Sequence, residues 1–326
     1  MPAQTLGGNA VFNFLSQPNS AQLSALGGVN VSAIGNEVGM SFHNPALLRY
    51  GMHQQVNTSF NAFLAGIKNY SITSAYHIDP IQTNIAVGVN YFNYGTITQT
   101  DASGNIMGTF RPADYVLQVM ASKQYHERFW YGITMKYINS SYGQYRSSGL
   151  AFDVGIAYYD SANQWQVSMV AKNMGTQLKT YDGSNQKEEL PFDLQAGITK
   201  RLENAPFQFS LTAHHLHRFN IYYNDTTFRA SEGDNGYNDN TTTQKIFSHL
   251  VFSTQVFLSE KLELTTGYNF QRRQDLNAFN VTSGLNGFSL GVAILLKKLH
   301  IRYTTGFYQR NLFHQLSLNL NWKGKL

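Results

Sequence analysis

Segments in which apolar and polar side chains alternate recur along most of this chain. In the segment 84–91, Ile85, Val87, Val89 and Tyr91 occupy one set of alternate positions, and Asn, Ala and Gly occupy the other. Successive side chains of a β-strand point to opposite faces, so this pattern predicts a strand with one apolar face. Because such a face must be buried or meet lipid, the pattern restricts the chain to a few all-β architectures.

We expect fourteen such strands, with the first starting close to residue 54. Most are as long as the roughly nine to eleven residues that a tilted strand needs to cross a bilayer, whereas strands of soluble proteins average about five or six. The expected ranges are 54–65, 68–78, 83–94, 114–124, 129–138, 148–159, 164–172, 191–200, 206–216, 246–258, 261–271, 286–296, 298–309 and 314–323.

The apolar faces of these strands carry no charge, and the charged side chains within strands fall on the opposite faces. The segment 129–137 has Phe, Tyr, Ile, Met and Tyr on one face, whereas Lys136 lies on the other. By the same parity Asp153, Glu263 and Arg302 face away from the apolar side, and we expect them to pair and brace an interior. A closed barrel in a membrane has this arrangement, with apolar side chains toward lipid and polar side chains toward the lumen.

This assignment of faces makes Val292 a lipid-facing residue and Gly291 a lumen-facing one. We therefore expect an arginine at Val292 to be costly and a serine at Gly291 to be milder, because lipid excludes charge more strongly than a polar lumen does.

The connections between the expected strands alternate in length. Those on one side are short, such as "DPIQ", "YHER" and "DSAN", and those on the other side are mostly long: 95–113, 139–147, 173–190, 217–245 and 272–285. Short turns on one side and long loops on the other are typical of outer-membrane barrels. A soluble β-sandwich or a tandem repeat explains the alternation equally well, but it explains the strand lengths and the loop asymmetry less well.

The composition agrees with an envelope protein and argues against several other classes. Charged residues make up 13% of the 326 residues and the net charge is +5, with no basic stripe, so we expect no nucleic-acid binding. Cysteine is absent, which leaves no disulfide framework and no thiol chemistry. Ala3-Gln4 directly after Met1-Pro2 has the look of the end of a cleaved signal peptide, so we expect that the native leader is missing from this chain.

Few residues point to chemistry. In "HHLH", His215 and His217 would share one face of a strand and His214 would lie opposite, with no third ligand nearby, so we expect no metal site. The acidic stretch 232–240 lacks the ligand order of an EF-hand loop. No nucleophile motif or phosphate-binding loop is present, so we expect no catalytic residues, no cofactor and no enzymatic activity.

The first fifty residues read differently from the rest. Asn44, Pro45 and Ala46 form a helix start, because Asn caps exposed backbone N–H groups and Pro suits the first helical position. The following residues leave room for one or two turns before Gly51.

The same segment resembles the start of PorQ proteins of the Bacteroidota type IX secretion system, which are related to PorV and more distantly to FadL fatty-acid transporters. The similar pieces are Phe14-Leu15, the "A-x-x-x-ALGG" block at 21–28, and "F-x-NPALL" at 42–48. The resemblance covers essentially the whole chain and ends at "LSLNLNW". It implies a FadL-like transmembrane antiparallel barrel for 54–326 in the bacterial outer membrane, with 1–53 folded into the lumen as a plug. The alternative is that 1–53 is only a periplasmic segment that precedes the first strand.

The resemblance also implies a non-enzymatic role. A PorQ-like protein would anchor a PorZ-like surface protein near PorV- and PorU-like components, in a complex that removes cargo signals and attaches cargo to lipopolysaccharide. The alternatives are a FadL-like transporter of hydrophobic compounds and a PorV-like cargo shuttle. For the partner we expect the loop Leu216–Lys245, whose exposed aromatic side chains are Tyr222, Tyr223, Phe228 and Tyr237.

Overall fold

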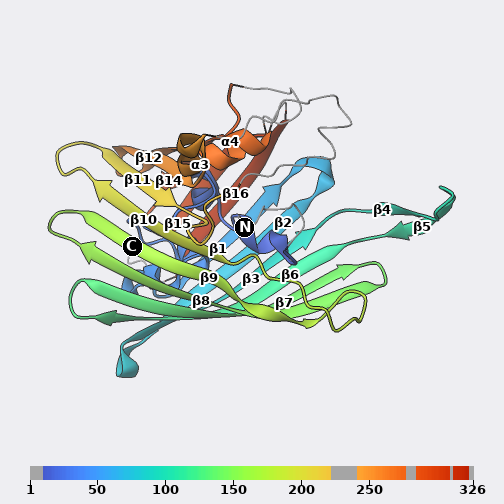
Figure 1. Ribbon diagram of the computed structural model, residues 1–326. Coiled ribbons are helices and arrows are strands. Elements are labelled where there is room, and N and C mark those ends of the chain that lie inside the picture. Colours follow the sequence, from blue (N-terminus) through green and yellow to red (C-terminus); the bar gives the residue numbers. More distant parts are fainter. Residues whose placement is uncertain (1–9, 222–240, 277–283, 309–310, 323–326) are drawn as a thin grey trace.

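In the computed structural model of the protein, one antiparallel sheet closes on itself because its first strand pairs with its last (Figure 1). The structure describes residues 10–221, 241–276, 284–308 and 311–322. Within these residues the barrel has fourteen strands, as the sequence predicts, and each pairs with its neighbours in chain order. The strands are β1 (Gln55–Ala62), β2 (Lys68–Ile78), β3 (Thr83–Asn93), β6 (Ala113–Tyr125), β7 (Phe129–Tyr142), β8 (Tyr145–Asp160), β9 (Trp165–Lys179), β10 (Asp193–Arg201), β11 (Phe207–Ala213), β12 (Leu250–Ser259), β13 (Leu262–Asn269), β14 (Phe288–Leu295), β15 (Leu299–Tyr308) and β16 (Asn311–Asn321).

The barrel wall presents the predicted faces. The apolar side chains of β7 point outward, and Ile133 and Met135 are about half exposed. Leu290, Val292 and Ile294 of β14 are likewise exposed on the outside. The inward positions carry buried Asn, Gln, Ser and Thr side chains, so the sheet is polar inside and apolar outside. This arrangement lets the outer surface meet lipid while every paired strand keeps its backbone hydrogen bonds.

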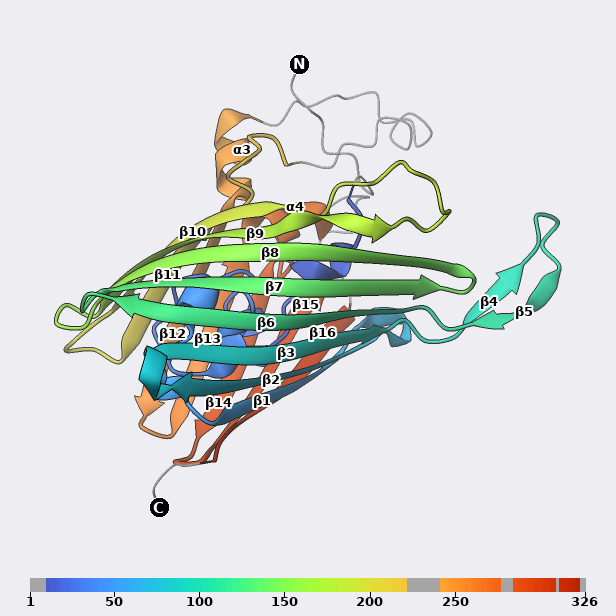
Figure 2. The ribbon, with the colours of Figure 1, turned by 90° about the horizontal axis from the view of Figure 1, so that it is seen from below.

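The connections differ from the prediction in two places. The prediction of a long loop at 139–147 is wrong, because β7 and β8 continue through this segment as a hairpin that turns at residues 143–144. The loop 95–113 contains a separate hairpin of β4 (Ile97–Thr100) and β5 (Ile106–Phe110), which projects away from the barrel wall (Figure 2). These segments are polar or irregular in pattern, and strand pairing beyond the membrane does not need apolar alternation.

Two expected strand ends are helical instead. Helix α3 (Thr242–Ser248) precedes β12, and helix α4 (Phe270–Leu276) follows β13. Thr241 begins α3 with a capping box, in which its hydroxyl accepts from the Gln244 backbone N–H and the Gln244 side chain accepts from the Thr241 N–H. No helix among the described residues has the length and apolar character to cross a membrane.

Residues 10–54 lie inside the barrel and are termed the plug here (Figure 2). The plug consists of short helical pieces: η1 (Asn13–Ser16), α1 (Ala21–Ala25), η2 (Val38–Phe42), η3 (Pro45–Leu47) and η4 (Tyr50–Met52). Its apolar side chains pack against inward residues of the wall, for example Val38, Leu48 and Met52 against Ala86 and Met120. The apolar core of the molecule therefore lies between plug and barrel.

Glycines in the wall make room for the plug backbone. A Cβ atom on Gly132 of β7 would lie 2.6 Å from the Pro45 carbonyl carbon and 2.9 Å from the Ala46 nitrogen. A Cβ on Gly291 of β14 would lie 2.6 Å from the Ala25 Cβ. That side of β14 therefore faces a packed plug rather than an open lumen, so a serine at Gly291 would meet Ala25, and the expectation that it is milder than an arginine at Val292 stays a prediction.

Replacing Gly132 by alanine is expected to lower the free energy of unfolding by about 1–3 kcal/mol, because the new methyl group would overlap the plug backbone at Pro45 and Ala46 and force it to shift. Urea unfolding in lipid vesicles, followed by tryptophan fluorescence, measures the change. Gly284→Ala is the control, because no atom of the described structure lies within 4 Å of a Cβ there. Equal effects of the two substitutions would show that the wall does not fit the plug this closely.

Candidate functional site

Buried ion pairs join the plug to the wall. Glu37 of the plug accepts from the Arg302 Nε, at 2.8 Å from each carboxylate oxygen. The Arg302 guanidinium also contacts Glu263 of β13, with Nη1–Oε1 at 2.8 Å and Nη2–Oε2 at 3.0 Å. All three side chains are less than one-tenth exposed. One guanidinium thus bridges two carboxylates in the fork geometry that arginine forms best.

A second buried pair lies on the other side of the lumen. The Lys136 Nζ is 2.6 Å from Asp153 Oδ2 and donates to Asn173 Oδ1 at 2.9 Å. The expectation that Lys136, Asp153, Glu263 and Arg302 face inward and pair is confirmed. What the sequence alone did not reveal is that Glu37 of the plug joins one of the pairs.

Hydroxyl and amide groups of the wall satisfy the backbone of helix α1. The Ala21 N–H donates to the Ser317 hydroxyl at 2.8 Å, and Thr304 donates to the Ala21 carbonyl at 2.7 Å. Asn269 of β13 donates to the Gly27 carbonyl at 3.1 Å just beyond the helix. A helix this short leaves most of its N–H and C=O groups free, so these contacts fix where it sits.

Asn44, Pro45 and Ala46 lie where the plug meets β7 and β8. The Asn44 side chain accepts from the Ala46 N–H at 3.0 Å, and its amide donates to the Val31 carbonyl at 2.8 Å. Pro45 occupies the first position of η3. One side chain thus caps the helix and also ties it to an earlier part of the plug.

An apolar cavity of about 360 Å³, termed the rim pocket, opens at the end of the barrel that carries the β1–β2 and β15–β16 connections. Phe14 of the plug and Phe92 of β3 meet edge to face at 5.6 Å between ring centroids, and Phe63 lies 6.0 Å from Phe313 of β16. Its lining is Asn13, Phe14, Gln17, Phe63, Leu64, Ile67, Phe92, Tyr94, Tyr308 and Phe313. Apolar walls with a few polar groups at the edge are typical of sites for small hydrophobic ligands.

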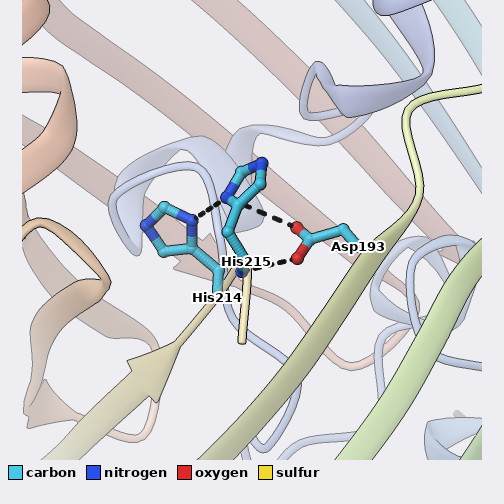
Figure 3. A group of neighbouring side chains, drawn as sticks. All are labelled: Asp193, His214 and His215. Atoms are coloured by element: carbon cyan, nitrogen blue, oxygen red, sulfur yellow. Dashed lines mark hydrogen bonds and ion pairs between the residues drawn. The ribbon is translucent and has the colours of Figure 1, made fainter. Parts of the chain in front are cut away.

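A polar cavity of about 340 Å³ lies beside the rim pocket, with which it shares Gln17 and Tyr308, and is termed the histidine cavity. His214, His215 and Asp193 line it together (Figure 3), and one ligand atom from each lies within 4.8 Å of the others. The imidazole nitrogens Nδ1 of His214 and His215 are 2.5 Å apart, and His215 Nδ1 is 4.0 Å from Asp193 Oδ2. Burial lowers the pKa of His214 to about 3, so this ring is neutral at pH 7.

The predicted arrangement of the "HHLH" motif is wrong. Strand β11 ends at Ala213, and His215 has a left-handed backbone with φ of 54°, so the alternation of a strand does not apply to His214 and His215. Asp193 is the group that sequence reasoning missed. The β10–β11 register places it near residue 216, and the Leu216 N–H indeed donates to the Leu194 carbonyl at 3.0 Å. Hairpin pairing was the signal that would have found this carboxylate.

The aromatic residues expected to hold a partner, Tyr222, Tyr223, Phe228 and Tyr237, lie outside the described residues. The prediction of a docking loop at Leu216–Lys245 therefore stays a prediction.

No protein-family model matches the sequence, and no curated protein matches it. Several solved structures are similar in fold. A TodX monoaromatic hydrocarbon channel with a deltaS2 mutation is 12% identical with a TM-score of 0.54, over 94% of this chain and 97% of that one. The CymD monoaromatic hydrocarbon channel is 12% identical with a TM-score of 0.50, over 95% and 97% of the two chains.

A Pseudomonas aeruginosa FadL homologue is 8% identical with a TM-score of 0.54, over 93% of this chain and 98% of that one. At these identities the likeness is one of fold. The protein is a closed, fourteen-stranded antiparallel barrel of FadL-like architecture.

Proposed function

We propose that this protein is an integral outer-membrane barrel that takes up a small hydrophobic compound, and that the rim pocket is where the compound first binds. The pocket is the observation that carries the proposal. The similar folds of channels described as conducting monoaromatic hydrocarbons support it. The role is a non-catalytic one, with no cofactor.

The chemistry of the rim pocket suits an apolar ligand of modest size. Phe14, Phe63, Phe92 and Phe313 give it aromatic walls, and its volume of about 360 Å³ lies in the range that small-molecule sites occupy. An aromatic or short aliphatic compound would replace water at these rings and gain hydrophobic free energy in proportion to the area covered.

The plug forms part of the pocket, which connects binding to passage. Phe14 belongs to η1, so a ligand in the pocket touches the plug as well as the wall. Apart from the histidine cavity, buried plug side chains fill the lumen, so the compound crosses only if the plug shifts or the wall lets it out sideways. The ion pairs of Glu37 would hold the later part of the plug while the segment near Phe14 moves.

The Phe63→Gln variant tests this function. Phe63 is only partly buried, and a glutamine there puts an amide into the apolar pocket, so the affinity for toluene is expected to fall roughly ten-fold or more. Saturation-transfer NMR on protein in nanodiscs, with empty nanodiscs as the blank, measures binding, and retention of labelled toluene by cells measures uptake.

Phe219→Gln is the matched control, because that ring is 61% exposed and lies outside the pocket. If toluene binds wild type and Phe63→Gln equally, or if uptake does not depend on the protein, the channel proposal fails.

A second candidate is the anchor role that the N-terminal resemblance to PorQ proteins implies. One observation favours it: β4 and β5 project beyond the wall with Ile106 and Met107 exposed at 75% and 67%, as a docking element would. In this case the partners are a PorZ-like surface protein with PorV- and PorU-like components at lipopolysaccharide. A PorV-like cargo shuttle is the third possibility.

A pull-down from native membranes in mild detergent separates these roles. An anchor retains a surface protein, and replacing residues 96–111 by a short Gly/Ser linker releases it while the barrel stays inserted. A shuttle retains secreted cargo instead. A channel retains neither, and the linker variant then takes up toluene as wild type does.

A further inference from the structure

We propose that Asp193, His214 and His215 form a binding site for a divalent transition-metal ion, with Zn²⁺ as the best match. Its three ligands do not line the rim pocket, although the two cavities share Gln17 and Tyr308, and the proposal does not rest on either proposed role. It rests on the geometry of the histidine cavity, where three ligand groups from two neighbouring strand ends converge (Figure 3).

The backbone brings the two imidazoles together. In a continued strand His214 and His215 would point to opposite faces, but the left-handed conformation of His215 prevents this. A non-glycine residue in that region is strained by about 1 kcal/mol or more, and such positions concentrate at functional sites. Here the strained residue is one of the proposed ligands.

The contact between the two imidazoles requires a proton or a cation between the rings. Two bare ring nitrogens repel each other at 2.5 Å, so the Nδ1 atoms of His214 and His215 need a proton or a metal ion between them. His214 is 1% exposed, and its Nε2 has no hydrogen-bond partner in the described part of the chain. A buried nitrogen without a partner is costly, but the ion would bind through Nδ1, so the proposal does not depend on Nε2.

Small movements would create a metal site. Two nitrogens bound to one tetrahedral Zn²⁺ at about 2.0–2.1 Å lie roughly 3.3 Å apart, so the rings would separate by about 0.8 Å from their present 2.5 Å. Asp193 Oδ2 would approach from its present 4.0 Å from His215 by a similar amount. Side-chain rotation suffices for changes of this size.

Outer contacts already orient the ligands. The His215 N–H donates to Asp193 Oδ1 at 2.6 Å, and the Gln195 amide donates to Oδ2 at 2.5 Å. The His249 ring, through Nδ1, contacts the His214 carbonyl at 2.7 Å and so fixes the backbone that carries the pair. Hydrogen bonds of this kind hold metal ligands in position in known sites.

The donor set selects the metal class. Two imidazoles and one carboxylate suit Zn²⁺ and similar divalent ions, whereas Ca²⁺ requires six or more oxygens and Cu(I) prefers sulfur. Lys172 and Arg272 also line the cavity, and their charges oppose a dication while Asp193 and Asp275 favour it. The cavity leaves room for a fourth ligand, which water supplies in open zinc sites.

Isothermal titration of Zn²⁺ into the detergent-solubilised chain, without a polyhistidine tag, tests the proposal. Wild type is expected to bind one Zn²⁺ per chain. Asp193→Asn, His214→Gln and His215→Gln are each expected to weaken binding roughly 100-fold or more, because each removes a direct ligand. X-ray absorption at the zinc edge is expected to show two imidazoles and oxygen around the ion.

His217→Gln is the matched control, because His217 belongs to the same motif but packs on Phe192 at 4.8 Å between ring centroids and is not one of the three ligands. It is expected to leave the affinity unchanged. Heat-modifiable gel mobility shows whether each variant is folded. If a histidine variant does not fold, Asp193→Asn still tests the site. Equal affinity in wild type and His215→Gln, equal weakening by His217→Gln, or far less than one Zn²⁺ per chain would each overturn the site.

Discussion

Replacing Arg302 by methionine is expected to lower the free energy of unfolding by roughly 3–5 kcal/mol. The side chain is buried, and its loss leaves the carboxylates of Glu37 and Glu263 in the lumen without the guanidinium that bridges them, with His300 at 2.9 Å as the neighbour that stays on Glu37. Methionine fills most of the volume, so the effect comes from charge rather than from a cavity. Because Glu37 belongs to the plug, the plug should also detach from β15, and protease added to the detergent-solubilised protein should then cut near Glu37.

Two further variants isolate the cause. Arg128→Met removes an arginine that is 51% exposed and lies 3.4 Å from Asp160, so its effect on stability should be far smaller than that of Arg302→Met. Combining Arg302→Met with Glu37→Gln and Glu263→Gln removes all three charges and should recover part of the loss, since no uncompensated charge stays buried. If the triple variant is as unstable as Arg302→Met alone, packing rather than charge holds this end of the plug.

The barrel wall was predictable because its determinant is local. Each strand that crosses the apolar layer must alternate, and the lengths of β2, β3 and β14 follow from the thickness to be crossed. Outside that layer the constraint disappears, which is why the β7–β8 hairpin, β4 with β5, and the helices α3 and α4 were missed. The polar residues there form strand pairs or helices without an alternating pattern in the sequence.

For the interior of the barrel, the sequence predicted only which polar side chains face the lumen and not which of them meet the plug. Parity places Arg302 and Glu263 in the lumen, but nothing in the sequence near Glu37 shows that it meets them across more than two hundred residues. The fit of Gly132 to Pro45, and of Gly291 to Ala25, also depends on how the plug folds back. The position of Asp193 beside His214 was partly predictable, because the β10–β11 register alone brings the two strand ends together.

The resemblance to PorQ proteins and the structural likeness to hydrocarbon channels bear on different questions. The first rests on the order of short motifs in the plug, such as the Asn44–Leu48 segment, and the second on the course of the whole wall. The fold accommodates both roles. The rim pocket and the β4–β5 hairpin distinguish the two roles, because a channel needs the pocket and an anchor needs a surface that another protein can bind.

An arginine at Val292 is expected to destabilise the barrel by roughly 2–4 kcal/mol, measured by reversible urea unfolding in lipid vesicles. Val292 lies in the middle of β14, faces outward, and pairs with Leu264 of β13 and Tyr303 of β15, which are also exposed. The guanidinium would sit among apolar side chains at a depth where lipid supplies no water and no counter-charge, so it would have to bend toward the headgroups at a cost in packing.

Leu296→Arg is the matched control for this position. Leu296 lies on the same face just beyond the end of β14 and is similarly exposed, at 44% against 38% for Val292. An arginine there reaches the headgroups directly, so the expected loss is only about 0–1 kcal/mol. The difference between the two variants measures depth in the membrane and cancels the intrinsic cost of replacing an apolar side chain by arginine. If the two losses were equal, the outward face of β14 would not lie in lipid, and the exposed apolar belt would need a protein surface to cover it instead.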